Sequence, residues 1–116
     1  MTISPKPGEI WLVKFPFSDL TSAKLRPALV LAIHREEVII LGIFSKIPTG
    51  NLKESWVLIK DSDRQFAQTG LKKTSVIRAD KIATVSKLVF HRKLGHLPAR
   101  FSSIVQKSLK KALNII

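Results

Sequence analysis

Arg78 and Asp80 are the sharpest pair of potentially reactive side chains in the sequence, because only Ala79 separates them. The surrounding residues favour a strand, in which side chains two positions apart lie on the same face. A guanidinium and a carboxylate side by side form either a structural ion pair or an acid/base couple able to act on a phosphodiester. Spacing alone favours the ion pair, and both interpretations stay open at this point.

Arg26 offers a second guanidinium, and the proline that follows it restricts how the backbone presents it. Pro27 biases Arg26 towards an extended backbone and marks the start of a strand. Polar residues precede this pair, and an apolar run follows it. We therefore expect the guanidinium of Arg26 at the mouth of a small β structure, where a phosphate could bind it.

The chain carries 20 Lys and Arg residues against 8 Asp and Glu residues, a net charge of +12 in 116 residues. Such an excess repels itself and attracts polyanions. Nucleic acid is therefore the leading partner, ahead of an anionic membrane or an acidic protein segment. Loops that meet at one end of a β structure commonly carry binding residues. The side chains expected to bind a nucleic acid there are Lys24, Lys46, Lys72, Lys73 and Phe17.

Other kinds of active site lack the residues they need. The sequence has no cysteine, which excludes disulfides, thiolate catalysis and cysteine–zinc sites. Its 3 histidines are scattered, and its few carboxylates poorly supply a two-metal nuclease. No Gly-x-Ser-x-Gly elbow surrounds any serine, so serine-hydrolase chemistry has no support. We expect no metal and no cofactor.

The sequence also limits the cellular location of the protein and its number of domains. No apolar run approaches the roughly 20 residues of a membrane helix, and residues 1–8 do not resemble a signal peptide. We expect a cytoplasmic protein that makes no contact with a membrane. The length predicts a single domain, residues 1–116, with a small core.

Runs rich in Val, Ile, Leu and aromatic residues predict short strands followed by one terminal helix. The helix is expected to begin at Pro98, which suits its first turn, and apolar residues such as Phe101, Ile104 and Val105 recur within it at helical spacing. Many short strands and one helix favour a small β-barrel or a strongly bent sheet. Both faces of the strands are apolar, so one face should fill the core and either the helix or a second subunit should cover the other. We expect a homodimer. Core packing is the favoured role of Trp11 and Trp56. The predicted strands are residues 10–15, 28–34, 38–45, 55–60, 74–77, 82–85 and 91–97.

Residues 8–13 read Gly-Glu-Ile-Trp-Leu-Val, and residues 26–31 read Arg-Pro-Ala-Leu-Val-Leu after a variable loop. These stretches resemble the MazF/PemK-like toxins, and the connecting residues 15–20, Phe-Pro-Phe-Ser-Asp-Leu, resemble the PemK-like branch in particular. Residues 70–81 resemble the segment of that branch around its functional Arg-x-Asp. The resemblance covers nearly the whole chain.

The resemblance implies both a fold and an activity. The implied fold is mainly β with a C-terminal α-helix, an SH3-like small β-barrel of the CcdB/MazF/PemK toxin type, usually a homodimer. The implied activity is metal-independent cleavage of single-stranded RNA at short sequences, which a cognate antitoxin inhibits. Attack by the ribose 2′-hydroxyl on the neighbouring phosphate needs a base, a proton for the leaving oxygen, and cations around the phosphate.

The resemblance also assigns roles to catalytic residues. Asp80 is the implied base, and Arg78 is the implied acid or phosphate stabiliser. We favour the stabilising role, because a guanidinium hardly deprotonates. Arg26 supplies a second set of guanidinium N–H donors to the phosphate. The third strand of the family usually ends in a Thr whose hydroxyl contacts the scissile phosphate, followed by a second hydroxyl residue. This chain has Phe44 and Ser45 there. Adjacent strand residues point to opposite faces, so Ser45 replaces the missing hydroxyl only if a bulge re-aims it.

Three hypotheses of function follow. The first is a sequence-selective endoribonuclease, the toxin of a toxin–antitoxin pair. The second is a non-catalytic nucleic-acid-binding barrel of the same fold, which Phe44 favours. The third is inhibition of another protein, as the related gyrase-binding toxins do, and little in the sequence supports it.

Overall fold

The computed structural model describes residues 4–14, 24–47, 50 and 52–115. Within these residues the chain forms six strands and a C-terminal helix, α1 (Ser102–Leu113). Short 3-10 turns lie at Phe66–Thr69, Lys87–Val89 and Ala99–Phe101. The strands are β1 (Glu9–Lys14), β2 (Leu25–His34), β3 (Glu37–Phe44), β4 (Trp56–Ile59), β5 (Ser75–Ser86) and β6 (Phe90–His96).

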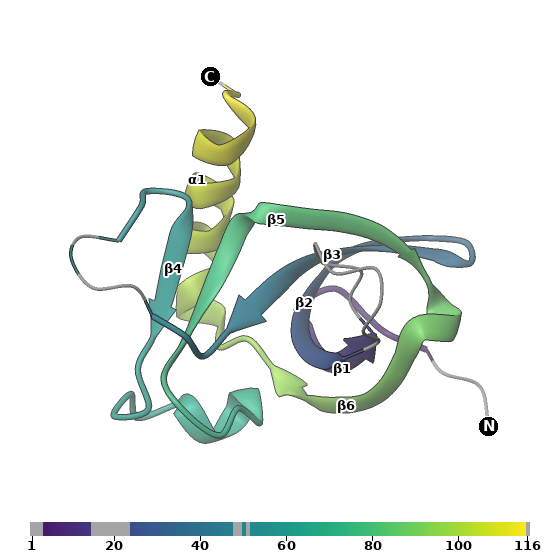
Figure 1. Cartoon of the computed structure of the whole chain (residues 1–116), viewed down its shortest axis with the longest axis horizontal. Coiled ribbons are helices and arrows are strands. Elements are labelled where there is room, and N and C mark those ends of the chain that lie inside the picture. The colour runs from purple at the N-terminus through teal and green to yellow at the C-terminus, as the bar shows by residue number, and fades with distance from the viewer. Residues whose placement is uncertain (1–3, 15–23, 48–49, 51, 116) are drawn as a thin grey trace.

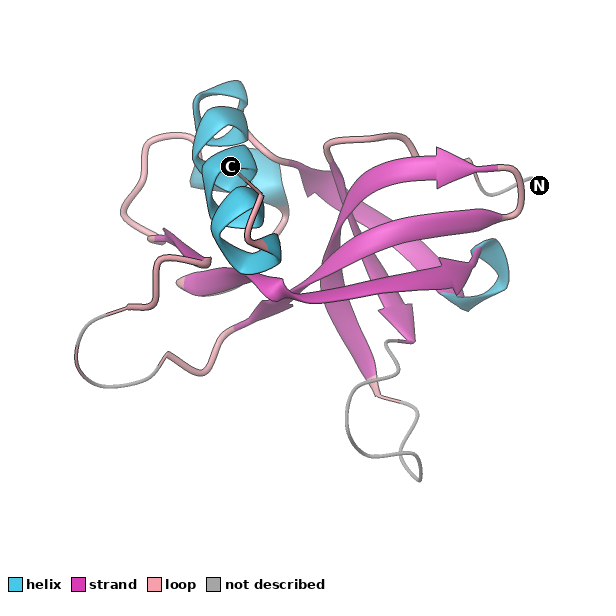
Figure 2. Ribbon diagram, turned by 90° about the horizontal axis from the view of Figure 1, so that it is seen from above, coloured by secondary structure: helices cyan, strands magenta, loops and turns pink. Residues whose placement is uncertain are grey.

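All six strands belong to one antiparallel sheet, in the order β4-β5-β3-β2-β1-β6. The sheet curls strongly, and α1 packs against one end of it (Figures 1 and 2). The two edge strands, β4 and β6, are not paired with each other, so the sheet is not closed. The expected mainly β fold with a C-terminal helix is confirmed, in the form of a strongly bent open sheet.

The sequence predicts two short strands where the structure has the single strand β5. Polar residues at positions 78, 80 and 81 interrupt the apolar pattern, but pairing keeps this stretch extended. The first half of β5 pairs with both β3 and β4, whereas the second half pairs with β3 alone. The register shifts between these halves, because Leu41 pairs with Ile82 while Gly42 pairs with Arg78. A bulge of this kind bends a strand without ending it.

Two apolar clusters fill the two faces of the bent sheet. One includes Ile10, Leu41 and Ile77 and is covered by Val105 of α1 and by Phe101 of the 3-10 turn before it. The other contains Trp11, Val30, Ile40 and Phe90, with the Trp11 and Phe90 rings edge to face at 5.7 Å. Trp11 is only 8% exposed, so its predicted core position is confirmed. Both faces are buried because the sheet curls over the second cluster.

The terminal helix begins later than Pro98, since a 3-10 turn at Ala99–Phe101 precedes α1. Val105 is buried in the predicted apolar face, but Ile104 is 45% exposed and does not belong to it. Asn114 ends the helix in the left-handed conformation (φ 57°). No helix in the described part of the chain is long and apolar enough to cross a membrane.

Candidate active site and nucleic-acid interface

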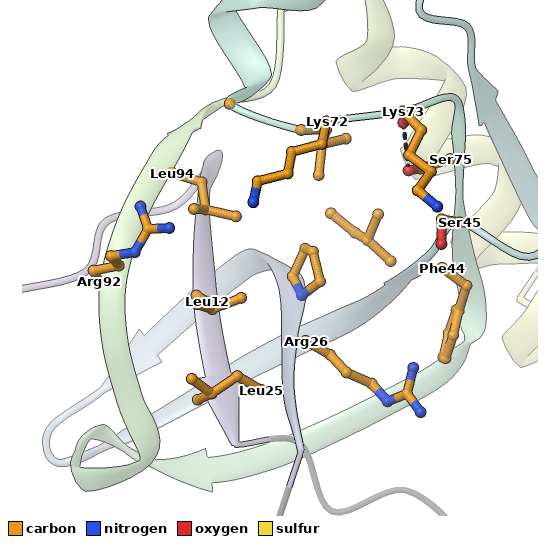
Figure 3. A pocket seen from close by; sticks show the side chains of 14 residues that line it. Leu12, Leu25, Arg26, Phe44, Ser45, Lys72, Lys73, Ser75, Arg92 and Leu94 are labelled. Carbon is orange, nitrogen blue, oxygen red and sulfur yellow. Dashed lines mark hydrogen bonds between the residues drawn. The ribbon is translucent and has the colours of Figure 1, made fainter.

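A pocket of about 490 Å³ opens at one end of the sheet, between the ends of β2 and β3 and the loop that precedes β5 (Figure 3). Its apolar lining comes from β1, β2, β3, β6 and that loop. The apolar side chains of the lining are Leu12, Leu25, Pro27, Ile43, Phe44, Leu71 and Leu94. A pocket of this size and lining can hold a flat organic group such as a nucleobase.

Four cationic side chains line the same pocket: Arg26, Lys72, Lys73 and Arg92. They come from three different directions, and Lys73 points toward Ser45 (Figure 3). None of the described residues that line the pocket is acidic. Cations gathered around low-dielectric walls focus a positive potential, so the pocket attracts an anion such as a phosphate.

Two glycines place the loop that carries Lys72 and Lys73 directly against β6. Gly70 is left-handed (φ 72°), and a Cβ at this position would overlap the backbone carbonyl of Leu94. A Cβ at Gly95 would in turn overlap the backbone carbonyl of Gln68. The buried Thr69 fixes the turn at Gly70, because its hydroxyl accepts a hydrogen bond from the Leu71 amide at 3.1 Å. This wall of the pocket is therefore set by contact between two backbones.

Arg92 reaches the pocket because β6 pairs with β1. Leu12 and Arg92 are register partners, next to a bulge. The neighbouring Lys93 forms an ion pair with Glu9 at 2.9 Å, which ties β6 to β1. Strand residues alternate between faces, so Arg92 points into the pocket while Lys93 meets Glu9 elsewhere. The sequence analysis did not identify Arg92 as a site residue, and only the long-range β1–β6 pairing reveals it.

Arg78 and Asp80 meet on one face of β5, as their spacing predicts. Arg78 donates from Nε to Oδ1 at 3.1 Å and from Nη2 to Oδ2 at 2.6 Å, a two-pronged ion pair. The indole of Trp56 donates a further hydrogen bond to Oδ1 at 2.9 Å. The hydrogen bonds and charge of Arg78 hold the pKa of Asp80 below its usual range, against the opposing effect of partial burial.

A row of alternating aromatic rings and guanidiniums joins this ion pair to the pocket. The Cζ atom of Arg78 lies 4.3 Å from the centroid of the Trp56 ring and 5.8 Å from that of Phe44. The Cζ atom of Arg26 also lies 5.8 Å from the centroid of Phe44. Trp56 is half-buried and holds Arg78, so its role is wider than the core packing that the sequence favours.

The predicted site residues fall into three groups. Arg26, Ser45, Lys72 and Lys73 line the pocket. Arg78 and Asp80 are not among its lining residues, but Phe44 is, and it contacts Arg78. The predicted RNA-binding residues Lys24 and Lys46 are exposed and do not line the pocket, and Phe17 lies outside the described residues.

Ser45 lines the pocket together with Phe44, although alternation along a strand would place them on opposite faces. The reason is that β3 ends at Phe44, and Ser45 lies in the bend that follows. Strict alternation therefore no longer applies at this position. Within the described residues, no group of three or more His, Cys, Asp or Glu side chains is placed to hold a metal ion.

The described chain is a small β protein with a strongly bent antiparallel sheet and a basic pocket beside a guanidinium–carboxylate pair. The family model described as "PemK-like, MazF-like toxin of type II toxin-antitoxin system" matches residues 6–113. The chain belongs to this family. A search of curated protein sequences finds no match.

Solved structures of toxins share the fold at low sequence identity. One is an endoribonuclease in complex with its cognate antitoxin from Mycobacterial species, 19% identical, TM-score 0.72, with 97% of this chain and 98% of that chain covered. The Mycobacterium tuberculosis toxin MazF-mt6 is 19% identical, with a TM-score of 0.74 over 93% of this chain and 98% of that one. MazF from Deinococcus radiodurans is 20% identical, with a TM-score of 0.72 over 98% of this chain and 100% of that one.

Proposed function

We propose that this protein is a metal-independent, sequence-selective endoribonuclease that cleaves single-stranded RNA and acts as the toxin of a toxin–antitoxin system. The observation that carries the proposal is the grouping of Arg26, Phe44 and the Arg78–Asp80 pair at the edge of a basic pocket without acidic lining residues in the described chain. Membership of the toxin family and its fold support the same activity.

The pocket and the guanidinium row divide the binding of the RNA between them. Arg26 and Arg78 bind the scissile phosphate, where their planar forks suit two phosphate oxygens. Lys72, Lys73 and Arg92 attract the flanking phosphates, and the apolar wall takes a base of the same strand. Ser45 donates a hydrogen bond to a phosphate oxygen from the rim. Unstacked bases reach such a pocket only in single-stranded RNA.

Asp80 acts as the base, and RNA binding itself prepares it. In the free protein Arg78 occupies both carboxylate oxygens and keeps the pKa of Asp80 low, which makes the carboxylate a weak base. A phosphate competes for the donors of Arg78 and brings its own negative charge. Both effects raise the pKa of Asp80 towards its usual range and free a lone pair.

The reaction then runs as an internal displacement at phosphorus. Asp80 removes the proton of the ribose 2′-hydroxyl, and the 2′-oxygen forms a bond to the neighbouring phosphorus. The bond from phosphorus to the 5′-oxygen breaks, and that oxygen takes a proton from the Lys73 ammonium or from water. The products are a 2′,3′-cyclic phosphate and a 5′-hydroxyl end. Arg26 and Arg78 stabilise the extra negative charge on the phosphate oxygens in between.

The test is incubation of the purified protein with mixed-sequence single-stranded RNA in the presence of EDTA. We expect cuts at short sequences that leave 5′-hydroxyl ends, and loss of these cuts in Arg26→Ala and Arg78→Ala. Lys110→Ala, on the exposed face of α1, is the matched control and should cut normally. RNA that is bound but left intact by the wild type would overturn the proposal.

That outcome would support a second candidate, a non-catalytic nucleic-acid-binding protein of the same fold. Phe44 favours it, because the side chain stands where the family usually has a threonine hydroxyl on the phosphate. Losing one hydrogen-bond donor to a developing oxyanion commonly costs about 10²- to 10³-fold in rate. Binding that weakens steeply with salt, without any cleavage, is its signature.

We also propose a cytoplasmic protein with two protein partners, a cognate antitoxin and a second copy of this chain. The antitoxin is supported by family membership and by the related endoribonuclease solved with its own antitoxin. A small gene for a protein with an acidic tail directly upstream would support it further. The dimer is tested by mass measurement in solution, where a monomer at micromolar concentration would contradict it.

A further inference from the structure

Phe44 makes a contact that its sequence position does not suggest: its ring faces two guanidiniums at once. The Cζ atoms of Arg26, on β2, and Arg78, on β5, each lie 5.8 Å from its centroid. β3 lies between β2 and β5 in the sheet, so the strand that carries Phe44 separates the two arginines. Gly42, two residues earlier on β3, pairs with Ala28 of β2 and with Arg78 of β5.

The contact matters because two guanidiniums beside one ring carry like charges and repel each other. The negative face of an aromatic ring attracts a cation, by about 0.5–1 kcal/mol at exposed sites. A ring shared by two cations therefore offsets part of their repulsion. A guanidinium stacked on a ring keeps its N–H groups at the edge of its plane, free for a phosphate. Within the described chain, no hydrogen bond or ion pair occupies the guanidinium of Arg26.

We infer that Phe44 is a positioning residue that holds Arg26 and Arg78 as a two-guanidinium clamp for the scissile phosphate of a single-stranded RNA. The inference rests on the proposed function and deepens it. Trp56 completes the clamp, because it stacks on Arg78 at 4.3 Å and anchors the Asp80 carboxylate that Arg78 binds. Phe44 contributes no hydrogen bond of its own to the phosphate. It acts by fixing where the two sets of donors lie.

The test uses an RNA oligonucleotide with 2′-O-methyl groups, which lacks the attacking hydroxyl, so that binding is measured without cleavage. Affinity is measured from low to physiological salt for the wild type, Phe44→Leu and Phe44→Tyr. Each phosphate contact on a single strand contributes about 0.7 to the slope of log affinity against log salt. We expect Phe44→Leu to bind more weakly and to reduce the slope by about 0.7, the contribution of the one phosphate that both guanidiniums bind. Phe44→Tyr keeps the ring and should retain the wild-type slope.

The outcomes separate this inference from the proposed function. A wild-type slope in folded Phe44→Leu overturns the clamp while leaving the nuclease proposal intact. A wild type that neither binds the probe nor cuts unmodified RNA overturns the proposed function and the clamp with it. Circular dichroism establishes that each variant is folded.

A second measurement needs no variant and therefore does not depend on Phe44→Leu being folded. In the wild type, the Nε–H resonances of Arg26 and Arg78 are followed by NMR while the 2′-O-methyl probe is added. We expect both resonances to shift together and to saturate at the same probe concentration. A shift of only one of them, or saturation at different concentrations, overturns the clamp.

Discussion

Replacement of Asp80 by asparagine separates a catalytic carboxylate from a structural ion pair. Asp80 accepts hydrogen bonds from Nε and Nη2 of Arg78 and from the Trp56 indole. Asparagine has nearly the same shape and keeps one oxygen acceptor, but it carries no charge and cannot act as a base. Loss of a general base commonly costs about 10²- to 10⁴-fold in rate. We expect a loss of RNA cleavage in this range.

The stability of the variant should change little. The side chains of Arg78 and Asp80 are 25% and 35% exposed, so solvent screens their attraction. Ion pairs of this kind contribute up to about 1 kcal/mol, and asparagine keeps part of the hydrogen bonding. We therefore expect the free energy of unfolding, measured by urea titration, to fall by less than about 1 kcal/mol. A large loss of stability together with a loss of cleavage would identify a structural role instead.

The pH dependence of cleavage tests the same reasoning without a variant. Below its pKa a carboxylate is protonated and cannot act as a base. In the free protein this pKa is held below the ordinary 3.8, so kcat/KM should stay level down to that pH. Bound phosphate draws Arg78 away and raises the pKa of Asp80, so the acid limb of kcat should lie at higher pH. Both are measured with a short fluorogenic RNA in EDTA, over the range in which circular dichroism shows folded protein.

Two results would refute this account of Asp80. The first is a folded Asp80→Asn variant that cuts within a few-fold of the wild-type rate. The second is an acid limb of kcat at lower pH than that of kcat/KM. Glu37→Gln, an exposed carboxylate at the start of β3, is the matched control and should leave both profiles unchanged.

Three further predictions follow from the geometry. Because folding lowers the pKa of Asp80, its contribution to stability is complete above 3.8 and is lost as pH falls through the lowered value. The difference in unfolding free energy between wild type and Asp80→Asn should therefore shrink below pH 3.8, and a constant difference would contradict this. Gly95→Ala should lower the free energy of unfolding by about 1–3 kcal/mol, seen as a lower Tm, because its Cβ overlaps the Gln68 carbonyl. An unchanged Tm would contradict the close contact. Replacing Lys72 and Lys73 with glutamine should reduce the salt slope of RNA binding by about 0.7 per lost phosphate contact, whereas Lys110→Gln should not.

The sequence predicts the parts of this molecule that depend on local chemistry. Apolar runs rich in β-branched residues mark most of the strands, and the two-residue period places Arg78 beside Asp80. The sequence does not predict that β5 is one continuous strand, because pairing with β3 and β4 keeps its polar centre extended. Prediction from the local sequence pattern fails wherever pairing with other strands decides whether a segment is extended.

The same limit applies to the candidate site. Arg92 enters the pocket through the pairing of β6 with β1, and no spacing along the chain reveals that neighbour. The contact between Phe44 and two arginines depends on three adjacent strands in register. Trp56 looks like a core residue from its apolar surroundings, yet its indole is directed at the Asp80 carboxylate. These features belong to the tertiary structure and become visible only with it.

The reciprocal fit of Gly70 and Gly95 has a consequence for how the pocket can evolve. The wall between the loop and β6 is held by backbone, whereas Lys72, Lys73 and Arg92 extend from it on long side chains. In the proposed nuclease, substitutions among these three side chains can therefore change which RNA sequence is preferred without disturbing the backbone. The two glycines cannot vary in this way, since a Cβ at either position would push the loop away from β6. Within a lineage, substrate preference is expected to drift while this pair of glycines stays fixed.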